Sequence, residues 1–237
     1  PGVKALNNVN LKIERASIHA LVGENGAGKS TLMNILSGTI AHNEYTGQIL
    51  YNNNECKFQK IHDSEKLGIV IIHQELALIP ELTIAENMFL GNERKNRFGV
   101  IDWNETFHQA DTAMKAVGLN ENTQSLIKDI GTGKQQLVEI AKAISKDVKL
   151  LILDEPTDHL DMEAISALND GLKNFPGVII FASRDHQVVE TTANRIMEII
   201  DGKLIDKMTT YDEYLASDEE IKKRFTFTLS EEDAGDN

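Results

Sequence analysis

The pattern of hydrophobic and polar residues along the chain predicts strands alternating with helices. Short, nearly continuous apolar runs are typical of strands buried on both faces of a parallel sheet. Such runs occupy residues 17–22, 69–73, 150–153 and 178–181. Helical periodicity lies between them, at residues 31–37, 84–90, 103–117, 134–146 and 162–175. This alternation implies right-handed βαβ crossovers and a mostly parallel sheet.

Three further segments favour antiparallel pairing. Residues 3–13 alternate loosely and predict an N-terminal strand, and residues 47–51 predict a short strand that ends in a run of asparagines. Residues 195–200 and 203–206 can pair across the turn at Asp201 and Gly202. The fold class predicted is therefore α/β, with a mostly parallel core and an N-terminal antiparallel β portion.

The domain organisation follows from where strand candidates are absent. Residues 84–146 contain none, so we expect them to form a helical subdomain inserted into the α/β core. Its last helix, residues 134–146, is strongly amphipathic. We expect a single domain over residues 1–229, followed by an acidic, disordered tail at residues 230–237.

The charge excludes some function classes. The formal net charge of −13 over 237 residues argues against non-specific binding to nucleic acid or to an anionic membrane surface. No direct DNA binding is expected, but a local basic site and docking to a membrane protein stay open. No apolar run approaches the roughly 18 residues that a membrane span requires. We expect a cytoplasmic chain, with peripheral attachment to the inner face of the cell membrane as an alternative. Cys56, the single cysteine, is interpreted as a small buried hydrophobe.

Residues 23–30 carry the chemistry that organises the chain. They read GENGAGKS and fit the phosphate-loop pattern at every fixed position, between a predicted strand and a predicted helix. The glycines allow positive φ, the curled amides form a nest for phosphate oxygens, and the helix presents its positive end. Lys29 can reach the β- and γ-phosphates, and the Ser30 hydroxyl can bind Mg²⁺.

Two carboxylates supply the second half of the site. Asp154 and Glu155 end the apolar run at residues 150–153, at the carboxyl edge of the predicted sheet. Asp154 can hold Mg²⁺, and Glu155 can polarise an attacking water as general base.

With both elements in place, the chain resembles the ATP-binding cassette (ABC) family over nearly its whole length. Gln74 stands where the family's Q-loop glutamine contacts Mg²⁺ and the transmembrane partner. Residues 130–136 stand at the signature, residues 156–161 lead into the D-loop, and residues 183–185 stand at the switch-histidine loop. The resemblance implies a P-loop NTPase of ABC type, with ATP and Mg²⁺ sandwiched between two cassettes.

The resemblance also implies a role for each matching residue. The catalytic residues would be Glu155, Arg184 and Gln74, and the Mg²⁺ ligands Ser30, Gln74 and Asp154. The nucleotide-binding residues would be Gly23, Glu24, Asn25, Gly26, Ala27, Gly28, Lys29, Ser30 and Thr31. The signature residues, offered to the ATP of the partner cassette, would be Gly131, Thr132, Gly133, Lys134 and Gln135.

The chain departs from the family pattern in three places. Arg184 replaces the switch histidine; it can bind phosphate oxygens but has no acceptor nitrogen, and it could displace the water or pair with Glu155. We therefore expect slow hydrolysis, unless His186 or another group compensates. Gly131 and Lys134 replace the signature serine and glutamine. The turn at residues 14–17 lacks the family's usual glycine, which predicts a slightly strained bend.

The two halves of the chain resemble different subfamilies. Residues 1–156 are similar to the first cassette of a sugar-importer ATPase. Residues from about 158 are similar to the ABC-F ATPases, soluble proteins that act on ribosomes. This change of resemblance suggests a chimeric chain. The function expected is coupling of Mg-ATP hydrolysis to sugar import, with a second cassette and a permease docked in the Q-loop groove as partners. The alternatives are an ABC-F-like regulator on the ribosome and an ATP-binding module with impaired hydrolysis.

Overall fold

The computed structural model describes residues 5–73, 77–146, 148–157, 160, 162–200 and 202–217. Several predictions made from the sequence lie outside these ranges. They concern Gln74, half of the segment leading into the D-loop (residues 158, 159 and 161), and the acidic tail at residues 230–237.

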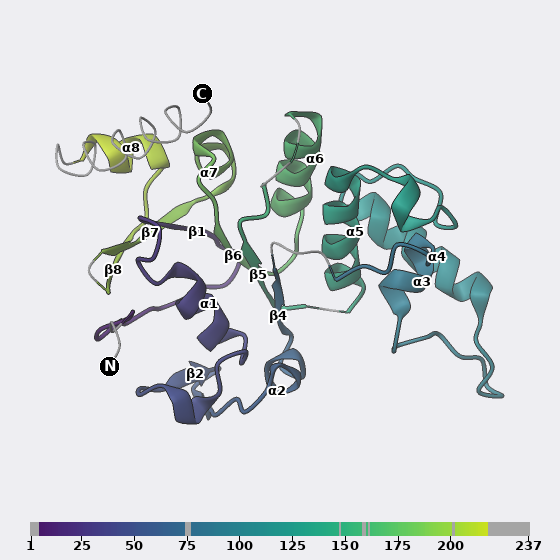
Figure 1. Cartoon of the computed structure of the whole chain (residues 1–237), viewed down its shortest axis with the longest axis horizontal. Coiled ribbons are helices and arrows are strands. Elements are labelled where there is room, and N and C mark those ends of the chain that lie inside the picture. The colour runs from purple at the N-terminus through teal and green to yellow at the C-terminus, as the bar shows by residue number, and fades with distance from the viewer. Residues whose placement is uncertain are drawn as a thin grey trace.

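A six-stranded sheet forms the centre of the molecule, in the order β4-β5-β6-β1-β7-β8 (Figure 1). The strands are β1 (Ile18–Val22), β4 (Ile69–Ile72), β5 (Leu150–Asp154), β6 (Val178–Ala182), β7 (Arg195–Ile200) and β8 (Lys203–Lys207). All neighbouring strands run parallel except β7 and β8, which pair antiparallel across the predicted turn. The mostly parallel α/β core predicted from the sequence is confirmed.

Both faces of the sheet are buried along β1, β5 and β6, which explains why these strands are apolar runs. β8, at the edge, alternates between exposed and half-buried residues. Successive side chains of a strand point to opposite faces. In β5, Leu151 and Leu153 therefore join one hydrophobic cluster, and Leu150 and Ile152 join the other. The first cluster also holds helix residues from α3 to α8, whereas the second receives α1.

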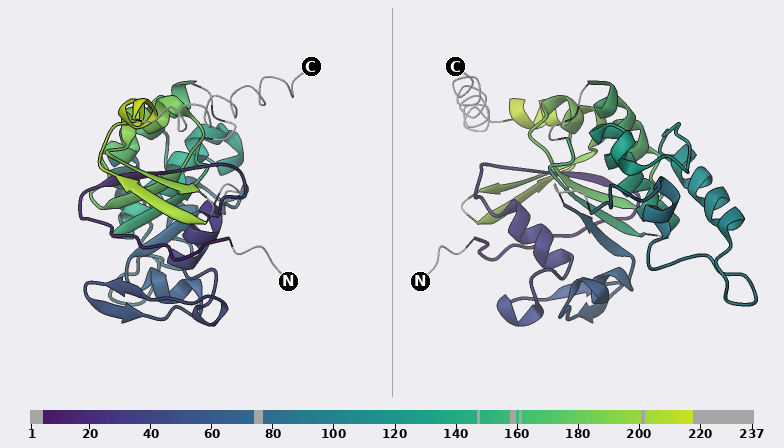
Figure 2. Two further views of the ribbon diagram at one scale, coloured as in Figure 1. Left: turned by 90° about the vertical axis from the view of Figure 1, so that its left-hand side faces the viewer. Right: turned by 45° about the vertical axis from the view of Figure 1, so that its right-hand side comes forward.

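The helices fall on the two sides of the sheet and beyond its β4 edge. They are α1 (Lys29–Leu36), α2 (Ile61–Glu65), α3 (Ile84–Phe89), α4 (Trp103–Ala116), α5 (Thr132–Ser145), α6 (Met162–Lys173), α7 (His186–Thr192) and α8 (Tyr211–Ala216). Two 3₁₀ turns, His42–Glu44 and Ile127–Asp129, complete the set in the described chain. Figures 1 and 2 show α3, α4 and α5 gathered at one end of the molecule, and α5 also packs on α6.

The N-terminal strand predicted over residues 3–13 is wrong for the part that the structure describes. Residues 5–14 contain no strand; Asn8 adopts a φ of 56°, and Asn7 N–H donates to the Gly202 carbonyl at 2.7 Å. The asparagine pair bends the segment out of the extended conformation. The antiparallel portion is instead a separate hairpin of β2 (Ile49–Tyr51) and β3 (Asn54–Cys56). Cys56, at its end, is half-buried and not part of the deep core.

The remaining differences concern short elements. The helix after the phosphate loop begins at Lys29 and not at residue 31. Helices α2 and α7, of five and seven residues, were not predicted. Within the described ranges, no helix is long and apolar enough to span a membrane.

Candidate functional site

The phosphate loop connects β1 to α1 with the backbone conformation that its glycines predict. Gly23, Gly26 and Gly28 have φ values of 135°, 78° and 112°. A Cβ on Gly23 or Gly28 would come within 2.7 Å of a backbone oxygen of Ile199 or Ala5. The side of Gly26 where a Cβ would stand is open, with no heavy atom of the described chain within 4 Å. A loop closed at its base and open at its crest is a suitable cradle for phosphate oxygens.

Lys29 lies under this loop. Its Nζ donates to the carbonyls of Gly23 at 2.7 Å and Glu24 at 3.2 Å, and the residue is only 8% exposed. Burial lowers the pKa of the ammonium, the neighbouring Glu155 opposes this, and Arg184 adds to the lowering. The buried ammonium is poorly hydrated, so it loses little hydration when it binds a phosphate.

Ser30 and Asp154 meet at the end of β5. The Ser30 hydroxyl lies 3.4 Å from Asp154 Oδ1, although the residues are 124 positions apart in the sequence. A hydroxyl and a carboxylate at this spacing are the ligand types that Mg²⁺ takes beside nucleotide phosphates. The residues present therefore fit the ion that the family pattern implies.

Glu155 follows directly and is held in a strained conformation. Its φ is 48°, in the left-handed region, while its N–H donates to the Ala182 carbonyl at 3.0 Å. Arg184 Nε lies 3.8 Å from Glu155 Oε1, so the pairing considered from the sequence is present. The guanidinium is half exposed and the carboxylate largely buried.

A hydrogen bond that the sequence did not predict joins the two loops that carry this pair. Thr157 Oγ1 lies 2.9 Å from Ser183 Oγ, and both residues are buried. Ser183 Oγ also accepts from the backbone N–H of Asp185 at 3.1 Å. Both residues lie in segments that the family resemblance singles out, but neither segment predicts the contact. The two residues are 26 positions apart and meet only through the pairing of β5 with β6.

His186 is engaged elsewhere and does not face Glu155. Its Nε2 lies 2.9 Å from Asp212 Oδ1, and its ring packs on Tyr211 with the centroids 5.0 Å apart. Both contacts are with α8. The structure therefore offers no support for compensation by His186.

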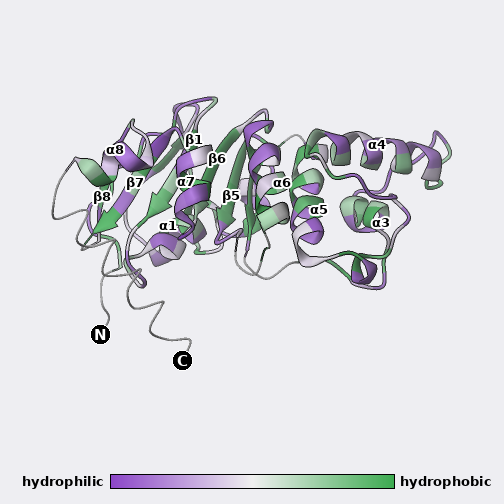
Figure 3. Cartoon of the chain, turned by 90° about the horizontal axis from the view of Figure 1, so that it is seen from above, coloured by the Kyte–Doolittle hydropathy of each residue, from purple (hydrophilic) through white to green (hydrophobic). Residues whose placement is uncertain are grey.

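The signature segment stands apart from the phosphate loop. Gly131 caps the N-terminus of α5, and Gly131, Thr132 and Lys134 are exposed. Lys134 Nζ pairs with Glu121 Oε1 at 2.5 Å, and Gln135 Nε2 donates to the Ile130 carbonyl at 2.9 Å. Figures 1 and 3 both show β5 and α6 between α5 and α1, so the two segments do not meet within one chain.

The structure thus brings one group of the predicted residues together and leaves another apart. Lys29, Ser30, Asp154, Glu155 and Arg184 converge at the carboxyl end of the parallel strands. The crest of the loop, Glu24 to Gly26, is exposed beside them, and Thr31 continues α1. Gln74 lies outside the described residues.

A phosphate loop after β1, a Ser–Asp pair and a glutamate directly after β5 are features of a P-loop nucleotide-binding site. The chain belongs to the ABC transporter family, whose model matches residues 6–158. Among curated relatives it is 51% identical over 225 residues to the L-arabinose transport ATP-binding protein of Geobacillus stearothermophilus, over 94% of this chain and 44% of that protein. It is 46% identical to the xylose import ATP-binding protein of Moorella thermoacetica, over 86% of this chain and 41% of that protein. The chain therefore spans less than half the length of these relatives.

Solved structures support the same fold. The ADP conformation of an ATP-binding cassette of an ABC transporter matches with a TM-score of 0.79 at 18% identity, over 94% of this chain and 92% of that chain. A dimeric ATP-binding cassette in a post-hydrolysis state, bound to ADP and Pi, matches with a TM-score of 0.70 at 25% identity, over 86% and 90% of the two chains.

Proposed function

We propose that the chain binds Mg-ATP at residues 23–31 and hydrolyses it to drive sugar import. The observation that carries this proposal is the convergence of Lys29, Ser30, Asp154 and Glu155 at one edge of the sheet. The similarity to arabinose and xylose import proteins, over 94% and 86% of the chain, supports a sugar, and a pentose in particular, as the transported substrate.

Each residue has a defined part in this chemistry. The loop amides and the Lys29 ammonium bind the phosphates and hold the γ-phosphate in place. Ser30 and Asp154 would hold Mg²⁺, which when bound neutralises charge that develops on the phosphate oxygens. Glu155 accepts the proton of the attacking water as general base. We propose Gln74 as a further polar contact, on the sequence resemblance alone.

Arg184 sets the rate in this proposal. Its Nε lies 3.8 Å from Glu155 Oε1, so the proposed general base is engaged in an ion pair. An arginine, with no acceptor nitrogen, cannot take over the role of a neutral imidazole in orienting the water. We infer slow turnover with intact binding.

The site requires a second cassette. The exposed start of α5, with Gly131 as its N-cap, offers backbone amides and a positive helix end to the ATP of a facing copy or a related cassette. We further propose, on the sequence resemblance alone, that a permease docks at the Q-loop, and that the chain works at the inner face of the cell membrane.

The residues that resemble the ABC-F family are explained by their packing and not by a function on the ribosome. Part of this resemblance lies in residues 210–215, which cover the N-cap and most of α8. Thr210 caps the helix, Tyr211 and Tyr214 are buried, and the Tyr214 hydroxyl bonds Glu198. Packing accounts for these residues without an RNA contact. Similarity to the arabinose protein over 225 residues also needs no second parent.

The decisive measurement is Mg-ATP turnover by phosphate release, for the chain and for Arg184→His. We expect both to bind ATP and the histidine variant to hydrolyse it about tenfold faster or more, because a free general base contributes 10²- to 10⁴-fold.

The controls show whether turnover depends on Glu155 and whether the effect of the histidine substitution is specific to Arg184. Glu155→Gln should abolish turnover in either background, and Arg97→His, an exposed arginine away from the site, should change nothing. A wild-type rate that equals that of Arg184→His would show that Arg184 does not restrain hydrolysis. Failure of both proteins to bind ATP would refute the proposal itself.

A further inference from the structure

One loop of this acidic chain is locally basic. Between α3 and α4, the stretch 94–101 carries Arg94, Lys95 and Arg97 and no acidic residue, in a chain with a net charge of −13. The flanking carboxylates are occupied at its base: Glu93 accepts from the Gly91 N–H, and Asp102 caps α4.

The stretch forms a hairpin that is held by backbone hydrogen bonds. Lys95 and Ile101 form a β-bridge, Asn96 N–H donates to the Val100 carbonyl at 2.9 Å, and Asp102 N–H donates to the Arg94 carbonyl at 2.8 Å. We call residues 94–102 the basic hairpin. Figures 1 and 2 show it projecting from the end of the molecule formed by α3 and α4.

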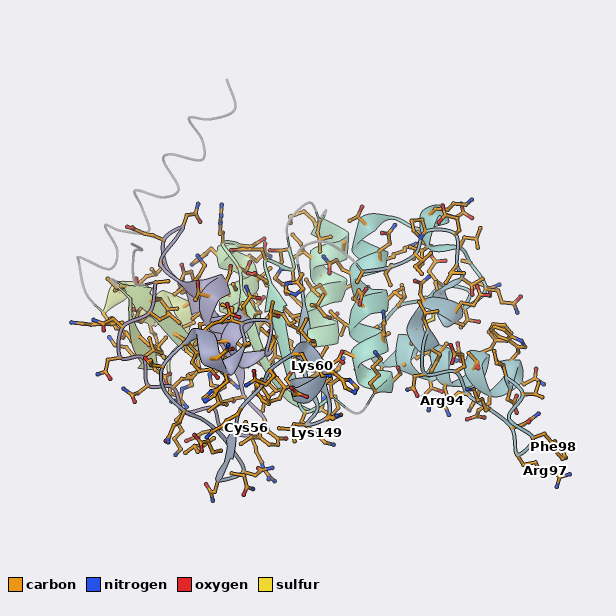
Figure 4. The ribbon with its side chains drawn as sticks, turned by 60° about the horizontal axis from the view of Figure 1, so that its bottom comes forward. Cys56, Lys60, Arg94, Arg97, Phe98 and Lys149 are labelled. Atoms are coloured by element: carbon orange, nitrogen blue, oxygen red, sulfur yellow. The ribbon has the colours of Figure 1, made fainter. Side chains whose placement is uncertain are left out.

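The tip of the basic hairpin is apolar as well as cationic. Phe98 is 75% exposed and Val100 61% exposed. Figure 4 shows Arg97 and Phe98 at the outermost point, directed away from the rest of the molecule. Trp103, at the start of α4, is exposed directly beyond the hairpin and stacks on Phe107.

Each arginine of the basic hairpin packs on an aromatic ring. The Arg97 guanidinium lies 4.7 Å from the centroid of the Phe98 ring, so the cation and the aromatic face form one unit at the tip. Arg94 stacks at 4.9 Å on Phe89, a buried residue of α3, and fastens the base of the hairpin to the fold. A rigid base with an aromatic and cationic tip is the composition of a membrane-interface anchor.

We propose that the basic hairpin binds the surface of an anionic lipid bilayer, with Phe98 and Val100 in the headgroup layer and Arg97 and Lys95 on lipid phosphates. The charge of the remaining chain does not prevent this contact, because fields beyond about 8 Å are largely screened at physiological salt and the hairpin projects outward. An acidic protein segment would pair with the cations but would not explain why Phe98 and Val100 are exposed. The inference rests on the hairpin alone and not on the proposed ATPase activity.

The chain carries its own reporter, because Trp103 is its single tryptophan. The test titrates the 237-residue chain with phosphatidylglycerol-containing vesicles and with phosphatidylcholine vesicles. It records Trp103 emission and co-sedimentation. We expect a shift to shorter wavelength and sedimentation with the anionic vesicles only, and both should weaken at high salt.

Matched variants locate the contact. Phe98→Ser should lower the vesicle affinity about tenfold, whereas Met208→Ser, at a residue that is 77% exposed elsewhere on the surface, should not. Replacing Lys95 and Arg97 by Gln should lower it about fivefold for each charge, whereas Lys12→Gln and Lys203→Gln should have no effect. Phosphate release without vesicles should be the same for Phe98→Ser and wild type.

Three results would overturn the proposal. They are equal binding to both kinds of vesicle, equal losses for the hairpin variants and their controls, and absence of binding to protein-free anionic vesicles. If binding then required a membrane protein in the vesicle, the hairpin would be a protein contact and not a lipid anchor.

Discussion

At the scale of single residues, His19 is a buried base at the centre of the sheet. It is 0% exposed, and its Nε2 lies 2.6 Å from Ser17 Oγ. Since the Ser17 hydroxyl donates to the Glu14 carbonyl, Nε2 carries the proton and donates to Ser17. Burial first, and then Arg195, lower the pKa of the imidazole from 6.5 to about 4. The folded chain therefore holds His19 neutral in a range where the unfolded chain binds a proton.

The consequence is a loss of stability in acid. Because the unfolded state binds more protons between pH 6.5 and 4, the contribution of His19 to the free energy of unfolding falls as the pH falls through this window. The expected loss between pH 7 and pH 5 is about 2 kcal/mol. Urea unfolding at both pH values measures it, and His19→Gln provides the reference, since carboxylates titrate equally in both proteins. An unchanged pH dependence in His19→Gln would contradict the assignment.

Two other residues show how far sequence reasoning reaches at this scale. The missing glycine at residues 14–17 predicted a strained bend, and Ala16 has a φ of 54°. The strain at Glu155, with a φ of 48°, was not predicted. A non-glycine residue in this region costs about 1 kcal/mol or more. A local pattern can show an unsuitable residue in a turn, but the conformation of Glu155 follows from the hydrogen bond to Ala182 on β6, which the pattern does not contain.

At the scale of elements, α5 and α6 come closest at a glycine near the start of α5. A Cβ on Gly133 would lie 2.1 Å from the Cβ of Ala164. The same glycine belongs to the proposed signature segment, while α6 follows the loop that contains Glu155. The contact therefore fixes the position of the α5 N-terminus relative to the edge of the sheet where Ser30 and Asp154 meet.

This contact predicts a compensating pair of substitutions. Gly133→Ala should lower the free energy of unfolding by about 1–3 kcal/mol, because an added methyl group has no room beside the Ala164 methyl. Adding Ala164→Gly should restore most of the loss, while Ala164→Gly alone should cost less. Thermal or urea unfolding of the four proteins measures the coupling. Additive effects in this cycle would show that the helices separate without strain.

The elements also show why some predictions succeeded. β1, β4, β5 and β6 are buried on both faces, so their apolar runs identify them without knowledge of neighbours. α2 and α7 are short and depend on local caps such as Asp185 Oδ1 accepting from Val188 N–H. The predicted N-terminal strand failed because loose alternation does not say whether a partner strand is adjacent, and the bend at Asn8 directs the chain elsewhere.

At the scale of the whole molecule, the phosphate loop and the α5 N-terminus lie on opposite sides of β5 and α6, so one chain cannot complete the proposed site. We expect Glu155→Gln to form a dimer in Mg-ATP, because bound ATP then persists between the two copies. Sedimentation velocity with and without ATP measures this. Adding Lys29→Ala, which removes the phosphate-binding cation, should return the protein to the monomer. ATP-independent dimerisation would contradict the head-to-tail arrangement.

The position of β8 at the end of the sheet has a consequence for solubility. Among the described strands, β8 pairs with β7 alone, so its outer backbone groups have no neighbouring strand. Ile205 is exposed on this strand between Lys203 and Lys207, on the same face. If the edges of two copies met, these lysines would be brought against each other, which disfavours continuous sheets between molecules. The lysines on β8 thus disfavour fibre formation through the open side of the sheet.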